Sequence, residues 1–117
     1  TNKIQAKRSM IAKEFSKEYN VVTVLKGRNT VIADPSGELA INSTGNSGMS
    51  TAGAGDVLSG VITALWAQGL SSFDAAKFGV YLHGLAGDLA VREMTQLGLI
   101  ASDIINFIPA ALKKSKR

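Results

Sequence analysis

Residues 43–60 combine a glycine-rich loop with a helix that begins directly after it, which are the two ingredients of an anion site. The stretch reads STGNSGMSTAGAGDVLSG and contains five glycines, although glycine is costly to order. Gly53, Ala54 and Gly55 leave backbone N–H groups unshielded just before an apolar helix predicted over residues 56–68. Such groups, together with the positive end of the helix dipole, bind phosphate. The sequence therefore predicts a backbone that approaches a charged ligand closely.

Asp56 lies at the entrance of this predicted helix, where an acidic side chain has two ordinary uses. It can cap the helix, because its carboxylate accepts hydrogen bonds from backbone N–H groups of the first turn. It can also act as a general base that takes a proton from a substrate hydroxyl. Lys26 also has two possible roles, since a lysine at a strand end either binds phosphate or is simply solvated. The residues alone leave both alternatives standing.

Composition and motifs exclude several other chemistries. The glycines are not followed by the Gly-Lys-Ser/Thr of a Walker loop, and the third glycine of the dinucleotide fingerprint is missing. The 117 residues include no cysteine and one histidine, His83, which excludes disulfides and thiolate or histidine-rich metal sites. His83 shares a predicted helix face with Gly79 and Gly87, so we expect it to be hydrogen-bonded in the interior. We expect Asp88 to be a structural helix acid.

The charge of the chain is divided along its length. Residues 1–28 sum to +5, residues 29–112 to −5 and residues 113–117 to +4, for a net charge of +4. The basic residues therefore lie at the ends, away from the glycine loop, and no base-reading element accompanies them. The apolar run at 57–70 is too short to span a bilayer, and the first residues lack the apolar core of a signal peptide. We expect a cytoplasmic protein that binds neither nucleic acid nor membrane.

Hydrophobic periodicity predicts a helix, three strands and three further helices. The predicted ranges are a helix over 3–19, strands over 21–25, 30–34 and 38–42, and helices over 56–68, from Ser71 or Ser72 to about Thr95, and over 102–112. Pro35-Ser36-Gly37 predicts the turn between the last two strands, and Ser102 is the expected cap of the last helix. Trp66 is expected in the core.

The predicted sheet is thin for the number of helices it must support. The strand over 21–25 is apolar throughout, which is typical of a strand buried on both faces between parallel neighbours. Three strands and at least four helices also leave apolar faces to cover. We therefore expect residues 1–117 to be part of a larger α/β protein whose N-terminal portion precedes them, and we expect a homo-oligomer.

Two levels of resemblance sharpen this picture. Residues 51–56, Thr-Ala-Gly-Ala-Gly-Asp, resemble the anion-hole motif of the ribokinase-like superfamily. A longer set of motifs is similar to the C-terminal part of the ADP- or ATP-dependent NAD(P)H-hydrate dehydratases, and the similarity runs from about residue 21 to residue 112. These motifs are LKGRNTVIADPSG (25–37), NSTGNSGMSTAGAGDVLSG (42–60), GVYLHGLAGDLA (79–90) and GLIASDI (98–104). The resemblance implies a ribokinase-like three-layer α/β/α fold, of which residues 1–117 form the C-terminal portion of a single domain.

The resemblance also implies a reaction. Enzymes of this family restore NADH and NADPH from hydrated forms, by phosphoryl transfer from ADP or ATP to the hydrate hydroxyl and loss of phosphate, and Mg²⁺ is expected. By position, Asp56 contacts the substrate as the catalytic base, and Gly53, Ala54 and Gly55 form the anion hole. The implied nucleotide site comprises Lys26, Gly27, Arg28, Asn29 and Thr30, together with Asn46, Ser47, Gly48, Met49, Ser50, Thr51, Ala52, Gly53, Ala54 and Gly55.

One departure keeps other functions open. The family wording in the loop is closer to Thr-Gly-Gly-Ser-Gly-Asp, whereas this chain has Ala52 and Ala54. The alanine at 54 matches the sugar-kinase wording, so a ribokinase-type kinase for a small molecule, such as a vitamin precursor or a sugar, is the alternative. A non-catalytic nucleotide-binding module is a third hypothesis. In the family much of the hydrate-binding surface precedes this segment, so an N-terminal fragment of the same protein is a candidate partner.

Overall fold

The computed structural model describes residues 2–116 and contains all seven predicted elements plus a short 3-10 helix. In chain order they are α1 (Asn2–Tyr19), β1 (Thr23–Leu25), β2 (Thr30–Ala33), β3 (Leu39–Asn42), the 3-10 helix η1 (Ser47–Met49), α2 (Ala54–Ala67), α3 (Ser72–Gly98) and α4 (Ala101–Ser115). The predicted boundaries differ from these by no more than three residues at each end.

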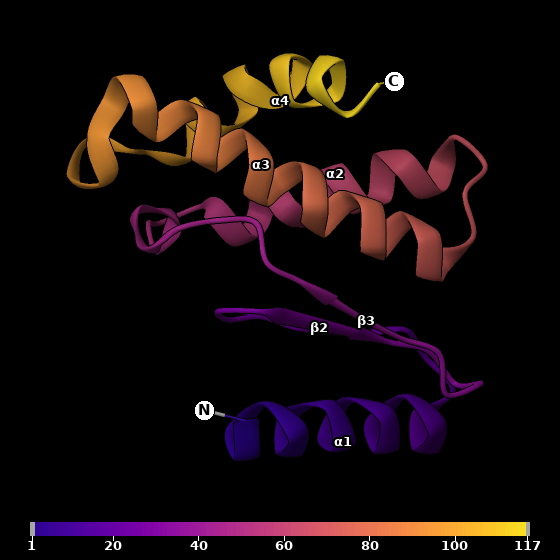
Figure 1. Cartoon of the computed structure of the whole chain (residues 1–117). Coiled ribbons are helices and arrows are strands. Elements are labelled where there is room, and N and C mark those ends of the chain that lie inside the picture. The colour runs from indigo at the N-terminus through magenta and orange to yellow at the C-terminus, as the bar shows by residue number, and fades with distance from the viewer. Residues whose placement is uncertain (1, 117) are drawn as a thin grey trace.

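The elements stack in layers around a small antiparallel sheet. Its order is β1-β2-β3, with Val24 opposite Ile32 and Ile32 opposite Ala40. Figure 1 shows α1 on one face of the sheet and α2 and α3 on the other, with α4 packed outside α3. This is the predicted three-layer α/β/α arrangement with one additional helix. The core between sheet and helices centres on Ile32, which is fully buried.

The prediction that residues 21–25 form a strand buried on both faces is wrong. In the structure β1 spans only Thr23–Leu25 and all three residues are half-buried, whereas every residue of β2 is buried. The reason is position, because β1 pairs with β2 alone and lies at one edge of the sheet. Within the described residues β1 has an antiparallel neighbour and no parallel one.

Helix α1 contacts the sheet through small residues, not through the apolar ones that indicated the helix. Ala12 and Ser16 are buried, and the Ser16 hydroxyl lies 2.7 Å from Thr23 Oγ1 and 3.1 Å from the Ala33 carbonyl oxygen. Small side chains allow the helix to approach the sheet closely. The large apolar residues of α1 are consequently at least 46% exposed, and they are Ile4, Met10, Ile11, Phe15 and Tyr19.

Two expectations for the later helices are also wrong. Trp66 is 58% exposed on α2 and is not part of the core, because α2 packs against α3 through other residues such as Ile62. Ser102 lies inside α4 and does not cap it. The carboxylate of Asp103 performs that function by accepting a hydrogen bond of 3.0 Å from the backbone N–H of Ile100. None of the helices within residues 2–116 is long and apolar enough to cross a membrane.

The contact between α2 and α3 generates a first prediction. A Cβ added at Gly79 of α3 would lie 2.7 Å from Ile62 Cγ1 and 3.3 Å from Ile62 Cα, so Gly79→Ala pushes the helices apart. We expect a loss of about 1–3 kcal/mol in the free energy of unfolding, measured by urea denaturation. Gly60→Ala is the matched control, because open space surrounds this helical glycine. That substitution should stabilise the protein by about 0.8–1 kcal/mol, and equal effects of the two variants would contradict the packing.

Candidate functional site

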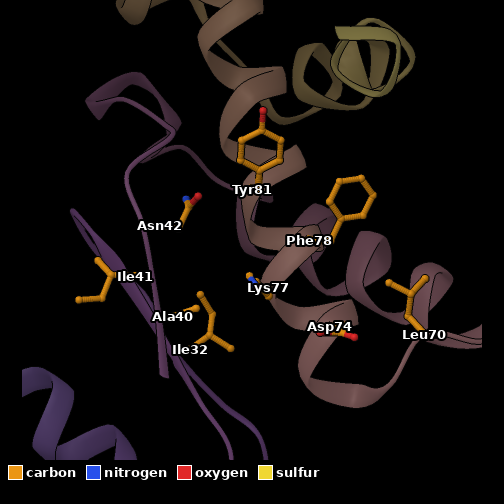
Figure 2. A pocket seen from close by; sticks show the side chains of 9 residues that line it. All are labelled: Ile32, Ala40, Ile41, Asn42, Leu70, Asp74, Lys77, Phe78 and Tyr81. Atoms are coloured by element: carbon orange, nitrogen blue, oxygen red, sulfur yellow. The ribbon is translucent and has the colours of Figure 1, made fainter. Parts of the chain in front are cut away.

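Among the cavities within residues 2–116, two that border the sheet and the helices have chemically different linings. The smaller, of about 410 Å³, lies between β3 and α3. Figure 2 shows Ile32 and Ala40 on one side of it and Phe78 and Leu70 on the other, and its mainly apolar lining also includes Asn42, Asp74, Lys77 and Tyr81. The larger, of about 820 Å³, is a polar cleft between the loop after β1, the loop after β3 and the start of α2. The larger cleft combines the Lys26 ammonium and several loop hydroxyls and amides with the start of a helix, an arrangement that suits phosphate, and it is the candidate site.

The first turn of α2 lies at one end of this cleft and is arranged to receive an anion. Gly53 precedes the helix with a left-handed φ of 89° and contributes no side-chain cap. The Ala54 N–H donates to the Thr51 carbonyl at 3.2 Å, but the N–H groups of Gly55 and Asp56 have no acceptor within residues 2–116. Unpaired N–H groups at a helix start carry the positive end of its dipole. Of the three amides that the sequence indicated, those of Gly53 and Gly55 have no acceptor within residues 2–116 and only that of Ala54 is engaged, while the amide of Asp56 is open as well.

Lys26 supplies a full positive charge directly above this turn. A Cβ built on Gly55 would lie 2.9 Å from the Lys26 Nζ atom, so the ammonium group rests against the backbone of the first turn. Lysine from the end of β1 and amides from the start of α2 therefore converge on one point, although they are about 30 residues apart in the sequence. An ammonium beside free helix N–H groups is a phosphate-binding arrangement.

Asp56 is not the N-cap of α2, so the capping alternative is wrong. Gly53 occupies the cap position, and Asp56 is the third residue of the helix, with an exposed side chain. Its carboxylate accepts no hydrogen bond from the part of the chain that the structure describes, and it does not line the polar cleft. The carboxylate is therefore available to a molecule that approaches the outer side of the first turn.

The loop after β1 is held by an arginine that the sequence analysis did not single out. From α1, Arg8 Nη2 donates to the carbonyls of Leu25 at 2.9 Å and Lys26 at 3.1 Å, and Nη1 donates to that of Arg28 at 3.0 Å and lies 3.3 Å from that of Asn29. One guanidinium thus binds the carbonyls on both sides of the turn that carries Lys26. No local spacing links residue 8 to residues 25–29, so only the fold reveals this contact.

The loop after β3 forms the opposite wall and contacts α3. The Thr44 hydroxyl donates to the Tyr81 carbonyl at 3.0 Å, and a Cβ at Gly84 would overlap Thr44 Oγ1. Further along, the Ser47 hydroxyl lies 2.7 Å from Gln96 Oε1. Gln96 follows Thr95, whose φ of 60° and ψ of 165° interrupt α3 at the residue where the sequence predicted its end. Such a conformation is strained for a β-branched residue, and it places Gln96 beside the loop.

His83 is buried and links α3 to the start of α2. Its Nε2 atom lies 3.0 Å from the carbonyl oxygen of Ala54, the first residue of α2, so a proton on Nε2 donates to that carbonyl. Burial lowers the pKa of His83, the hydrogen bond to Ala54 opposes this shift, and the charge of Lys26 adds to it. The imidazole is hydrogen-bonded inside the protein, as the sequence predicted, and it also lines the cleft.

The structure brings together most, but not all, of the predicted nucleotide residues. Those that line the cleft are Lys26, Gly27, Arg28, Asn29, Thr30, Asn46, Ser47, Met49, Ser50 and Ala54. Those that do not are Gly48, Thr51, Ala52, Gly53 and Gly55, and the predicted base Asp56 does not line it either. The lining also includes residues that were not predicted, namely Asn42, Ser43, Thr44, Gly45, Leu58, Val80, His83, Gly84 and Gln96. Within residues 2–116, no three His, Asp or Glu side chains cluster as a metal site.

Comparisons of the sequence and of the structure with known proteins point to the same family. The NAD(P)H-hydrate dehydratase family matches residues 1–110. The chain is 50% identical over 111 residues to the bifunctional NAD(P)H-hydrate repair enzyme of Moorella thermoacetica, covering 95% of this chain and 21% of that protein. It is 41% identical over 103 residues to the ADP-dependent (S)-NAD(P)H-hydrate dehydratase of Neisseria meningitidis, covering 86% and 34%.

A solved structure shows the same arrangement of elements. The ADP/ATP-dependent NAD(P)H-hydrate dehydratase from Bacillus subtilis, co-crystallised with ATP/Mg²⁺, superposes with a TM-score of 0.90 at 35% identity. The match covers 98% of this chain and 42% of that one. The chain therefore spans between about a fifth and two fifths of the length of these relatives.

The buried histidine generates a prediction about pH. Because the folded state lowers the pKa of His83, the unfolded chain binds more protons below the ordinary value of 6.5. The stability contributed by the neutral imidazole is therefore complete above pH 6.5 and is lost as pH falls from there through the lower, folded-state pKa. His83→Gln keeps a hydrogen-bond donor but cannot titrate. Urea unfolding between about pH 7 and 5 should show a steeper loss in the wild type than in His83→Gln, by at most about 1.4 kcal/mol per pH unit. If the unfolding free energies of the two proteins fall in parallel with pH, the titration of His83 does not contribute to stability.

Proposed function

Because the chain belongs to the NAD(P)H-hydrate dehydratase family, we propose that it carries the phosphoryl-transfer site of an enzyme that dehydrates hydrated NADH and NADPH with ADP or ATP. The observation that supports this most directly is the convergence of Lys26 Nζ with the open first turn of α2. That point lies at the end of a polar cleft of about 820 Å³, a volume suited to a nucleotide.

The chemistry requires a phosphoryl donor, because hydroxide is a poor leaving group near neutral pH. The hydroxyl oxygen of the hydrate attacks the terminal phosphorus of ADP or ATP, its proton passes to the Asp56 carboxylate, and AMP or ADP leaves. Phosphate then departs from the ring carbon with the C–O bond electrons. A proton is lost from the neighbouring carbon, and the pair that bound it restores the ring double bond.

Three groups of this chain have separate roles in that sequence. Lys26 and the amides of Gly55 and Asp56 neutralise charge that develops on the transferred phosphoryl group. The loops that carry residues 26–30 and 45–50 hold the rest of the nucleotide between them. The Asp56 carboxylate projects from the outer side of the same turn, so the hydrate approaches from outside the cleft and meets the phosphoryl group at the helix start.

Magnesium is expected to enter with the nucleotide. When bound, Mg²⁺ would neutralise part of the negative charge of the nucleotide phosphates. The cleft offers hydroxyl, amide and backbone oxygens to it, such as those of Ser43, Ser47 and Ser50. The absence of a carboxylate cluster within residues 2–116 fits an ion held mainly by the phosphates and water.

The chain is proposed to act as the C-terminal portion of one ribokinase-like domain. The β1 edge lacks a neighbour within residues 2–116, and the apolar side chains of α1 are exposed, so a preceding segment has a strand to pair with and a face to cover. We infer that full activity requires that N-terminal portion and that the complete enzyme is a homo-oligomer. A cytoplasmic location follows from the proposed substrates, which arise from intracellular NADH and NADPH.

Removing the positive charge above the helix start tests the anion site. Lys26→Met should weaken binding of ADP with Mg²⁺ by about 10–100-fold, the effect of losing a charged hydrogen bond, without changing the unfolding midpoint. The matched control is Lys77→Met, because Lys77 lies beside the apolar cavity. Isothermal titration calorimetry measures both. Equal losses in the two variants, or a loss only in the control, would place the nucleotide elsewhere.

Substitution of the base tests the reaction itself. Recovery of NADH from its hydrate is followed by absorbance, with Mg²⁺ and either ADP or ATP, for the chain alone and for a longer protein with the N-terminal portion restored. Asp56→Asn should lower the rate by at least about 100-fold and still bind nucleotide. Asp74→Asn is the control, since Asp74 is also the exposed third residue of its helix, and it should retain the rate.

One outcome of this assay would favour the kinase alternative over the dehydratase. If the longer wild-type protein binds nucleotide tightly but recovers no NADH, the dehydratase proposal is wrong. The small-molecule kinase that Ala52 and Ala54 favour is then tested with a panel of small alcohols. The nucleotide that supports the faster recovery identifies the physiological donor.

A further inference from the structure

Asp88 is an acidic residue outside the cleft that binds the loop forming one of its walls. From α3 its Oδ2 atom accepts a hydrogen bond of 3.0 Å from the backbone N–H of Gly45, and its Oδ1 atom accepts one of 2.9 Å from the Asn46 side-chain amide. Both carboxylate oxygens are therefore used by two consecutive loop residues more than 40 positions away in the sequence. Asp88 is thus the hydrogen-bonded helix acid that the sequence predicted, and both of its partners belong to the loop.

The face of α3 around Asp88 lets the loop approach closely. A Cβ at Gly84 would lie 2.7 Å from the Thr44 carbonyl carbon, and a Cβ at Gly87 would overlap the Met49 side chain. The loop consequently rests on helix backbone at these two positions. Hydrogen bonds from Thr44 to Tyr81 and from Ser47 to Gln96 hold the two ends of the loop on α3, and the two bonds to Asp88 hold Gly45 and Asn46 between them.

The contact with Asp88 is transmitted to the cleft through Asn46. The Asn46 side chain donates through Nδ2 to Asp88 and accepts through Oδ1 from the backbone N–H of Gly48 at 3.0 Å, which caps η1. Because the Asp88 carboxylate can only accept, the Asn46 amide must turn its Nδ2 atom toward Asp88. Its Oδ1 atom then faces Gly48 and caps η1. Ser47 and Met49 of η1 and the following Ser50 line the cleft, whereas Asp88 does not.

We propose that Asp88 is a positioning residue, which holds residues 44–50 in the nucleotide-binding conformation before the nucleotide arrives. The inference rests on the proposed nucleotide function of the cleft. A loop that is mobile before binding loses conformational entropy when the nucleotide orders it. Because Asp88 orders the loop in advance, binding no longer carries this cost, so Asp88 affects the affinity for the nucleotide and not the chemical step. Asp88 touches neither the first turn of α2 nor Lys26, which separates it from the groups assigned to phosphoryl transfer.

The test compares Asp88→Asn with the wild-type chain and with Asp74→Asn, which removes a carboxylate from the same helix without a loop contact. In the wild type, Gly45 and Asn46 each donate to a different carboxylate oxygen of Asp88. An amide at position 88 has only one acceptor oxygen, so the two donors can no longer have an oxygen each. Amide hydrogen exchange of the nucleotide-free chain should be about tenfold faster over residues 44–50 in Asp88→Asn alone. Titration with Mg²⁺ and ADP should show about tenfold weaker binding. In the longer protein the KM for the nucleotide should rise with kcat nearly unchanged.

A double variant shows whether the bond itself is responsible. Asp88→Asn with Asn46→Asp exchanges donor and acceptor. The amide introduced at position 88 donates to the carboxylate introduced at position 46, and that carboxylate still accepts from Gly48. This pair should restore slow exchange over residues 44–50, whereas Asn46→Asp alone should accelerate it by placing two carboxylates together. Exchange is the readout for the pair, because the relocated charge at residue 46 faces the cleft and repels phosphate.

The outcomes separate this inference from the function on which it rests. Unchanged exchange in Asp88→Asn, or no recovery in the double variant, would overturn the role of the bond. Faster exchange with unaltered nucleotide affinity would overturn the positioning role. A wild-type chain that binds neither ADP nor ATP would remove the proposed nucleotide site, and with it the nucleotide role of Asp88, while the exchange data still judge the bond.

Discussion

The proposed site depends on backbone amides that stay open at the first turn of α2 while the ammonium group of Lys26 rests against that turn. A Cβ on Gly55 would lie 2.9 Å from the Lys26 ammonium, so the lysine would have to move to admit one, and Gly53 enters the helix with a φ of 89°. His83 holds the same turn from the other side through the Ala54 carbonyl. Together these contacts leave two backbone amides and one ammonium facing a common point. Phosphate is the ligand that matches this combination of charge and directional donors.

The cleft is assembled from loops, and each loop is held by a charged side chain from a helix. Arg8 of α1 binds the carbonyls of the turn that carries Lys26, and Asp88 of α3 binds the amides of the loop before η1. The Arg8 guanidinium donates to carbonyl oxygens, and the Asp88 carboxylate accepts from N–H groups. Bonds between charged and backbone groups are stronger than neutral ones, so two residues order two loops. These two helices lie on opposite faces of the sheet, so each loop is held from a different layer.

Local patterns in the sequence predicted the type and order of every long element and the helix start at which we propose the anion site, because periodicity and glycine placement are local properties. Burial was harder to predict, since β1 is apolar but lies at an edge, and α1 contacts the sheet through Ala12 and Ser16. The cap of α4 came from Asp103, because its carboxylate reaches back to Ile100 where the Ser102 hydroxyl does not. The contacts of Arg8 and Asp88 gave no local signal. Their partners lie far along the chain, and only the fold brings these groups together.

The most direct test of this account is the response of backbone amides to nucleotide, measured by two-dimensional NMR on the isotope-labelled chain during titration with Mg²⁺ and ADP. We predict that the largest shifts belong to the amides of Gly55 and Asp56, followed by those of Lys26 to Thr30 across the cleft. Shifts concentrated at Ile41, Phe78 and Tyr81 around the apolar cavity, with the first turn of α2 unmoved, would contradict the assignment of the phosphate site.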